Sequence, residues 1–414
     1  MNLQIDSVRM LSEIEALALI SEAEPPVVTR VVFTPADMRA RAWLIEQCRA
    51  AGLAVRQDAV GNTFARWQGS DPAAPAVGTG SHLDAIPNAG KYDGVVGVLG
   101  GLEAIRSLQR AGFRPRNSVE LLLFTSEEPT RFGIGCLGSR LLSGTLLADS
   151  ARKLIDRNAE PLDEVRRKAG LSGELEDVRL PPGYYKAFLE LHIEQGPVLE
   201  RERVPLGIVT RIAAPASARV AIEGEGGHAG AVLMADRRDA LCAASELILA
   251  IENAARTSSI DTVATVGMCE VFPGAVNSIP SQVRISLDAR DTDLARRDSV
   301  MCSVEGAAKQ IAQRRGVSIG IELLNADAPA ECAQHVMDAL AVSCRKHELR
   351  FLPLISRAYH DSLFMARIAP VAMLFIPCRK GYSHRPDEYA AIEDIARGAL
   401  VLAETLASLS AQSS

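Results

Sequence analysis

The chain has 414 residues, enough for two domains, and its composition, 48% apolar and 23% charged, is that of a globular protein. A formal charge of -6 provides no basic surface for nucleic acid and no polybasic patch for a membrane. The sequence has no apolar stretch of membrane-spanning length, and its start lacks the pattern of a secretion signal. We therefore expect a soluble, cytoplasmic protein without nucleic-acid or membrane partners.

The cysteines are scattered along the chain without a C-x-x-C pair. We interpret them as reduced, mostly buried thiols, because free cysteine commonly packs as a small apolar residue. A catalytic or metal-binding cysteine is the alternative that this spacing leaves open.

The first half of the chain alternates helical and strand-like segments, which predicts an α/β layer fold. Helices are expected at residues 36–51 and 95–111, and strands at 53–57, 62–67, 76–81, 119–125 and 187–193. Residues 148–182 are charged and end in two prolines, which indicates surface helices and a connector.

From about residue 212 the pattern restarts, and it predicts a small α+β domain inserted into the first. Strands are expected at 218–223, 262–271 and 283–290, and helices at 237–255 and 294–315. After residue 331 the α/β alternation of the first half returns, with a helix, a strand at 371–376 and a closing helix at 392–409. The expected domains are residues 1–211 with 331–414, and residues 212–330.

Metal-ligating residue types follow the predicted strands of the first domain. These residues are His82, Asp84, Asp93, Glu127, Glu128, His192 and His384. Ligands of open α/β sheets gather at the carboxyl ends of strands, and imidazole with carboxylate suits zinc, manganese and related ions. Taken singly, a strand-end histidine is more often structural and a glutamate pair more often a solvated surface. Their joint occurrence favours a metal site.

Five ligands can hold two metals if one carboxylate, Asp93, is shared between them. Neighbouring side chains at the end of a strand point in different directions, so one of Glu127 and Glu128 can ligate while the other acts as base. Glu127 beside a metal-bound water can take its proton. We expect the Asp84 carboxylate to accept the ring N–H of His82 and so fix its tautomer.

Spaced motifs at residues 80–84, 90–94, 125–133, 190–196 and 226–230 resemble those of the di-metal amidohydrolase (hydantoinase/carbamoylase) family. That family includes allantoate amidohydrolases, N-carbamoyl-L-amino-acid hydrolases and ureidoglycolate amidohydrolases. The resemblance covers nearly the whole chain. It implies an exopeptidase-like α/β catalytic domain, an inserted lid that builds a homodimer, and two divalent ions per subunit, with manganese favoured and zinc, nickel or cobalt as alternatives.

The resemblance also implies a role for each metal-site residue. It places His82 and His192 on one ion, Glu128 and His384 on the other, and Asp93 between the two. Glu127 becomes the general base.

A substrate site is implied by the same resemblance, at Gln195, His228, Asn277 and Arg290. Arg290 has a planar fork that can grip a carboxylate, Asn277 can supply amide hydrogen bonds, and His228 can donate to an oxyanion. From the residues alone, an ion pair of Arg290 with Asp288 or Asp291 is the simpler interpretation.

Residues 356–361, Ser-Arg-Ala-Tyr-His-Asp, depart from the Ser-Gly-Ala-Gly-His-Asp pattern of the carbamoylases. With residues 90–94 and 376–384, this segment resembles the branch of the family that acts on ureidoglycolate. Tyr359, in place of a glycine, either shrinks the substrate pocket or is a packing residue, and His360 is similar to a substrate-site histidine of the family.

The activity implied is metal-dependent hydrolysis of the ureido C–N bond of (S)-ureidoglycolate to glyoxylate, ammonia and carbon dioxide, with a small ureido acid as partner. The nearest alternatives are hydrolysis of N-carbamoyl-L-amino acids or of allantoate. A metallopeptidase is more distant. A non-catalytic binding protein would require a lost ligand or base, and neither loss is visible.

Overall fold

The computed structural model describes residues 1–411, which form two compact units. The main unit comprises residues 1–210, 331–354 and those from 360 on, and the inserted unit comprises residues 211–330 and 355–359. Residues 355–359, expected in the first domain, therefore belong to the inserted unit. The chain enters and leaves that unit twice.

A nine-stranded sheet organises the main unit, in the order β16-β8-β18-β7-β4-β6-β3-β2, with β17 paired to β8. The central strands β18, β7, β4 and β6 are parallel, and antiparallel strands flank them. The bounds are β2 Ala54–Gln57, β3 Thr63–Trp67, β4 Ala76–His82, β6 Val119–Phe124, β7 Tyr185–Ile193, β8 Leu206–Ile212, β16 Ala330–Glu331, β17 Phe351–Ser356 and β18 Val371–Ile376.

Strands β6 and β18 are buried along their whole length, and β18 is apolar throughout, whereas β6 is apolar except for Glu120. This is the pattern of parallel strands that are covered on both faces. The larger helices of the main unit are α1 Ser7–Ala18, α2 Pro35–Ala50, α3 Val95–Arg110, α10 Gln334–Lys346 and α12 Ile392–Ala411. Among residues 1–411, none of the helices combines the length and apolarity that crossing a membrane requires.

Shorter elements connect the strands of the main unit. They are β1 Val28–Arg30, β5 Ala85–Ala89, α4 Leu137–Ser143, α5 Ala148–Ala151, α6 Leu162–Lys168, η1 Leu175–Val178, α7 Val198–Glu202, α11 Asp361–Met365 and η3 Arg379–Gly381. The charged region 148–182 thus forms short helices and a connector, as expected.

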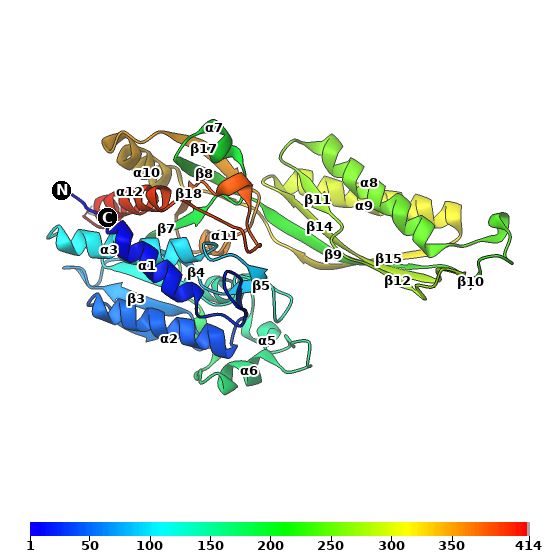
Figure 1. Cartoon of the computed structure of the whole chain (residues 1–414), viewed down its shortest axis with the longest axis horizontal. Coiled ribbons are helices and arrows are strands. Elements are labelled where there is room, and N and C mark those ends of the chain that lie inside the picture. The colour runs from blue at the N-terminus through cyan, green and yellow to red at the C-terminus, as the bar shows by residue number, and fades with distance from the viewer. Residues whose placement is uncertain (412–414) are drawn as a thin grey trace. The chain divides into compact units, whose positions relative to one another are not determined.

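The inserted unit is a five-stranded antiparallel sheet with two long helices on one face (Figure 1). Alternate residues of β9, from Ala216 to Ile222, are buried against α8 and α9, as in a sheet with one covered face. Its elements are β9 Ala214–Glu223, β10 Gly227–His228, η2 Met234–Asp236, α8 Ala240–Ser258, β11 Val263–Thr265, β12 Cys269–Phe272, β13 Ser278–Ile279, β14 Gln282–Asp291, α9 Leu294–Arg315 and β15 Ser318–Ala326.

The expected fold class, an α/β unit with an α+β insertion, is confirmed. The single strand expected at 262–271 is wrong, because β11 and β12 are separate strands that both pair with β14. Between them the register with β14 shifts by one residue, from Thr265 opposite Asp288 to Cys269 opposite Ile285. One extra residue in an antiparallel pair is a bulge, and Gly267 lies within this one.

Candidate active site

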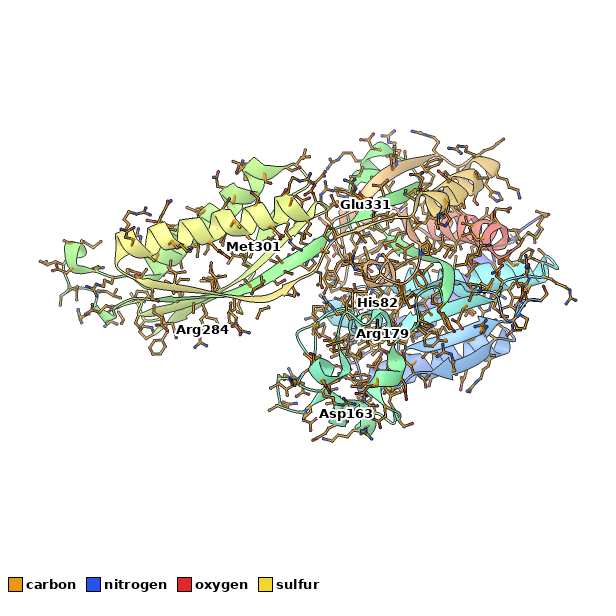
Figure 2. All side chains as sticks on the ribbon, turned by 180° about the vertical axis from the view of Figure 1, so that it is seen from behind. His82, Asp163, Arg179, Arg284, Met301 and Glu331 are labelled. Carbon is orange, nitrogen blue, oxygen red and sulfur yellow. The ribbon has the colours of Figure 1, made fainter. Side chains whose placement is uncertain are left out.

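The ends of three adjacent parallel strands bring the predicted site residues together. β4 ends at His82, which Figure 2 labels in the main unit, β7 carries His192 near its end, and Glu127 follows β6. Because β7, β4 and β6 are neighbours and parallel, their carboxyl ends lie at one edge of the sheet.

Two glycines make room for this arrangement. At Gly80, φ is +156° and a Cβ atom would lie 1.8 Å from the carbonyl oxygen of Leu122, so only glycine lets β4 approach β6 so closely. At Gly94, φ is +68° and a Cβ atom would lie 2.5 Å from Nε2 of His82. A side chain at either position would displace the strand end or the imidazole.

Asp93 lies at the centre of the cluster. Its Oδ1 is 3.1 Å from Nε2 of His192 and 3.9 Å from Nε2 of His82, whereas its Oδ2 is 3.2 Å from Nε2 of His384. The same His384 nitrogen is 3.0 Å from Oε1 of Glu128. Two groups of potential ligands result, His82–Asp93–His192 and Asp93–Glu128–His384, and they share Asp93.

The donor set fits two divalent cations. Hydrogen bonds that His384 donates to the carboxylates of Asp93 and Glu128 raise the pKa of His384 to about 11. Burial lowers the pKa of His192, but the hydrogen bond and charge of Asp93 outweigh it and bring that pKa to about 9. These carboxylates therefore favour positive charge between them, and imidazole and carboxylate are the ligands that zinc and manganese take.

Backbone carbonyls fix the orientation of two imidazoles. Nδ1 of His82 is 3.0 Å from the carbonyl oxygen of Asp84, and Nδ1 of His192 is 2.9 Å from that of Ile193. A ring that donates from Nδ1 keeps the lone pair on Nε2, which here faces Asp93.

The expected role of the Asp84 carboxylate is wrong. Its nearest oxygen is 3.8 Å from Nδ1 of His82, while the backbone carbonyl of the same residue accepts the ring proton. The carboxylate instead accepts the backbone N–H groups of Glu127 at 3.2 Å and Glu128 at 3.0 Å. Asp84 thus holds both strand ends: its carbonyl orients His82 and its carboxylate fixes the two glutamates.

Glu127 lies beside the metal-ligand residues without belonging to either group. Its Oε2 is 3.8 Å from Nε2 of His82 and its Oε1 is 3.7 Å from Sγ of Cys136. Burial, with the charges of Glu128 and Asp361, raises the pKa of Glu127 well above its usual range. A carboxylate in this environment gains from taking up a proton, as a general base must.

Two residues that the sequence did not single out hold Asp93 in place. Glu388 is buried and its Oε1 accepts the backbone N–H groups of Tyr92 at 2.8 Å and Asp93 at 3.1 Å. The hydroxyl of Ser383 donates to Oδ2 of Asp93 at 2.5 Å and lies 3.0 Å from Oε2 of Glu388. In the sequence, the sign that could have indicated this role is that Ser383 and Glu388 lie within four residues of His384.

Gln195 and His360 also lie in this cluster. Nε2 of Gln195 donates to Oδ2 of Asp93 at 2.8 Å, so in this structure Gln195 contacts the shared carboxylate. His360 is buried, and its ring packs edge-on against that of His192 with centroids 4.5 Å apart.

The remaining predicted substrate residues lie in the inserted unit. His228 and Asn277 are exposed neighbours, since His228 pairs with Ser278 and the N–H of Ala229 donates to the carbonyl of Asn277. Nε of Arg290 is 2.6 Å from Oδ1 of Asp288, the ion pair that the residues alone had suggested.

The Arg290 guanidinium also lies over the ring of Tyr359, 5.4 Å from its centroid. Tyr359 therefore packs on a proposed substrate-binding residue. Nη2 of Arg290 also donates to Oδ2 of Asp288 at 3.3 Å, so the ion pair uses both Nε and Nη2.

A sheet-edge cluster of three histidines and several carboxylates, with a glutamate outside both ligand groups, defines a metal-dependent hydrolase. The family described as "Peptidase family M20/M25/M40" matches residues 78–408. A ureidoglycolate hydrolase of Arabidopsis thaliana is 51% identical over 99% of this chain and 88% of its own length. An N-carbamoyl-L-amino-acid amidohydrolase of a Pseudomonas species is 36% identical, over 97% and 98% of the two chains.

Solved structures of similar proteins also match this chain over nearly its whole length. Crystal structures of AtUAH in complex with (S)-hydroxyglycine and with glyoxylate are each 51% identical to this chain, with a TM-score of 0.91 over 99% of it and 98% of theirs. The chain belongs to the M20/M25/M40 peptidase family, and it is a hydrolase of the amidohydrolase type.

Proposed function

We propose that this protein hydrolyses the ureido C–N bond of (S)-ureidoglycolate to glyoxylate, ammonia and carbon dioxide. The observation that carries the proposal is Glu127 beside two ligand groups that share Asp93, in a chain 51% identical to a ureidoglycolate hydrolase over almost its whole length. The ligands of the similar crystal structures fit this reaction. Hydroxyglycine is ureidoglycolate without its carbamoyl group, and glyoxylate is what hydroxyglycine becomes on losing ammonia.

Two divalent ions are part of the proposal, with manganese favoured over zinc, nickel or cobalt. His82 and His192 would hold one ion, Glu128 and His384 the other, and Asp93 both. Bound there, they supply Lewis acidity that lowers the pKa of a coordinated water. Chelation should abolish activity, and restored manganese should return it; full activity in protein shown to be metal-free would contradict this part.

In the proposed reaction Glu127 removes a proton from water while the water oxygen adds to the ureido carbonyl carbon. Glu127 then delivers that proton to the terminal nitrogen, and the bond from that nitrogen to the carbonyl carbon breaks, so ammonia leaves. The remaining carbamate loses carbon dioxide to give hydroxyglycine, which releases the second ammonia and becomes glyoxylate.

Recognition in this proposal relies on polar side chains of both units. Arg290 binds the substrate carboxylate, because its planar guanidinium matches the geometry of a carboxylate. Tyr359, packed on that guanidinium, limits the pocket to a small acid. His228 donates to the developing oxyanion and Asn277 to the ureido group, while Gln195 and His360 complete the site from the main unit.

We further propose a homodimer in which each active site takes residues from two copies of the inserted unit. His228 and Asn277 lie beyond the Gln282 end of β14, and Arg290 lies near the other end. The strand between Gln282 and Arg290 spans roughly 26 Å at about 3.3 Å per residue. Ureidoglycolate is far shorter, so one molecule cannot contact His228 and Arg290 of the same copy.

Mixed dimers test this arrangement. His228→Ala and Arg290→Ala should each be nearly inactive, but dimers unfolded and reassembled from an equal mixture should recover about a quarter of the wild-type activity, because half the dimers are mixed and each has one intact site. Failure to recover activity, with subunit exchange shown by mass spectrometry, would place both residues in one copy's site.

The products test the reaction itself. Ureidoglycolate turned over by the wild-type protein should yield glyoxylate, carbon dioxide and two equivalents of ammonia, measured in one sample. Release of urea in place of ammonia would contradict the proposed bond cleavage.

We also propose the cytoplasm as the compartment, because all eight cysteines are free thiols in the structure.

A further inference from the structure

Cys136 lies against the proposed general base, Glu127. The residue is fully buried, and Sγ is 3.7 Å from Oε1 of Glu127, within reach of an S–H···O hydrogen bond. The other oxygen of Glu127, Oε2, lies 3.8 Å from Nε2 of His82. The two oxygens of one carboxylate therefore face different partners.

The backbone fixes the position of this thiol relative to Glu127. The N–H groups of Cys136, Leu137 and Gly138 donate to the carbonyls of Glu127, Ser126 and Thr125 at 2.8, 2.9 and 2.8 Å. These N–H groups open helix α4 and have no partner within the helix. The segment that carries the base and the start of α4 are thus joined by three consecutive hydrogen bonds.

Cys136 adopts a left-handed backbone conformation, with φ 55° and ψ 35°. Glycine takes up this conformation without the steric cost that a Cβ atom brings, and glycines occur nearby at 135 and 138. A side chain retained in such a conformation next to a catalytic group suggests that the side chain itself is used.

The thiol also borders a second buried carboxyl, that of Asp361. Oδ1 of Asp361 is 2.5 Å from Oγ of Ser139. Burial raises the pKa of Asp361, and a hydrogen bond from the Cys136 thiol contributes to lowering it. Burial raises the pKa of the Cys136 thiol well above its usual range, so the sulfur keeps its proton and is a donor. A thiol has one hydrogen, which can go to Glu127 or to Asp361.

We propose that Cys136 is a positioning residue, whose S–H donates to Oε1 of Glu127 and holds the carboxylate with Oε2 directed at the metal-ligand residues. This inference rests on the base role of Glu127 in the proposed function. Without the thiol, Glu127 can rotate about its side-chain bonds, and fewer encounters with water are productive. Substrate and metal binding do not involve Oε1, so the effect falls on kcat.

Kinetics provide the first test, on metal-loaded enzyme with ureidoglycolate. Cys136→Ala should lower kcat about tenfold, the effect expected for one lost hydrogen bond to a charged group, with KM and metal content unchanged. Cys136→Ser, which keeps a donor, should recover most of kcat. Cys344→Ala, which removes another fully buried thiol from α10, is the matched control and should leave kcat unchanged. Wild-type kcat in Cys136→Ala, or equal losses in Cys136→Ala and Cys344→Ala, would overturn the proposal.

Infrared spectroscopy provides a test that does not depend on the substrate. The difference between wild-type and Cys136→Ser spectra isolates the S–H stretch of Cys136, which should move to higher frequency in Glu127→Ala because the acceptor is lost. If the S–H frequency is unchanged in Glu127→Ala but shifts in Asp361→Asn, the thiol donates to Asp361 and the inference is overturned. A correct band shift with no ureidoglycolate turnover would instead count against the proposed substrate alone.

Discussion

The two units hold their proposed site residues in different ways. In the main unit, His82, Glu127 and Glu128 are buried at strand ends and Asp93 is buried just before α3, and backbone groups or buried carboxylates fix them. In the inserted unit, His228 and Asn277 are exposed and Arg290 is half-buried beside Asp288. The main unit is thus organised for chemistry before substrate arrives, whereas the inserted unit presents side chains that acquire their function only with a ligand. Substitutions in the first should therefore change kcat, and a conservative substitution of the carboxylate-binding Arg290 in the second should change KM.

The largest effect is expected from Glu127→Gln. The amide cannot accept a proton, and loss of a general base costs about a thousandfold in kcat. Metal content should stay at the wild-type level because Glu127 belongs to neither ligand group, whereas Glu128→Gln, the adjacent control, should lose metal. Kinetics with metal analysis on the same samples checks both. Near-normal kcat in Glu127→Gln would assign the base elsewhere.

An intermediate effect is expected from Asp84→Asn. Its carboxylate fixes the backbone of Glu127 and Glu128, and weakening two charge-assisted hydrogen bonds should lower kcat about ten- to a hundredfold. His82 should keep its orientation, because a backbone carbonyl holds it. Asp58→Asn is the matched control, since Asp58 also accepts backbone N–H groups, from Val60 and Asn62, without contacting the site. A crystal structure of Asp84→Asn with a rotated His82 ring would contradict this account.

The smallest effect is expected from Arg290→Lys in the inserted unit. A lysine cannot form the bidentate contact, so KM should rise about tenfold while kcat changes little. Arg284→Lys on the same strand is the control, and Figure 2 shows Arg284 on the sheet face away from Met301 of α9. A fall in kcat without a change in KM would remove the distinction between the two units.

The sequence predicted the long, strongly patterned elements well. The helix at 294–315 and the strand at 371–376 have the expected bounds, because one depends on regular capping and the other on an uninterrupted apolar run. Strand β15 was missed, and its alternation is broken by the adjacent exposed residues Leu323 and Leu324. The bulge at Gly267 was also missed, since it depends on pairing with β14.

The site shows the same limit. Residue type and strand-end position were enough to predict that these histidines and carboxylates gather around Asp93. They were not enough to show that Asp84 accepts from the backbone, or that Cys136 and Glu388 contact the cluster, because these contacts depend on how loops distant in sequence fold together. The placement of Tyr359 on Arg290 is likewise a tertiary contact.

The central claim is that the residue cluster around Asp93 in the main unit hydrolyses ureidoglycolate. The most direct measurement is kcat/KM for ureidoglycolate, allantoate and a set of N-carbamoyl-L-amino acids and dipeptides, on one preparation of known metal content. We expect ureidoglycolate to be the best substrate, with glyoxylate as its product. If it is the poorest of the set, the proposed substrate is wrong, and the best alternative identifies the true one.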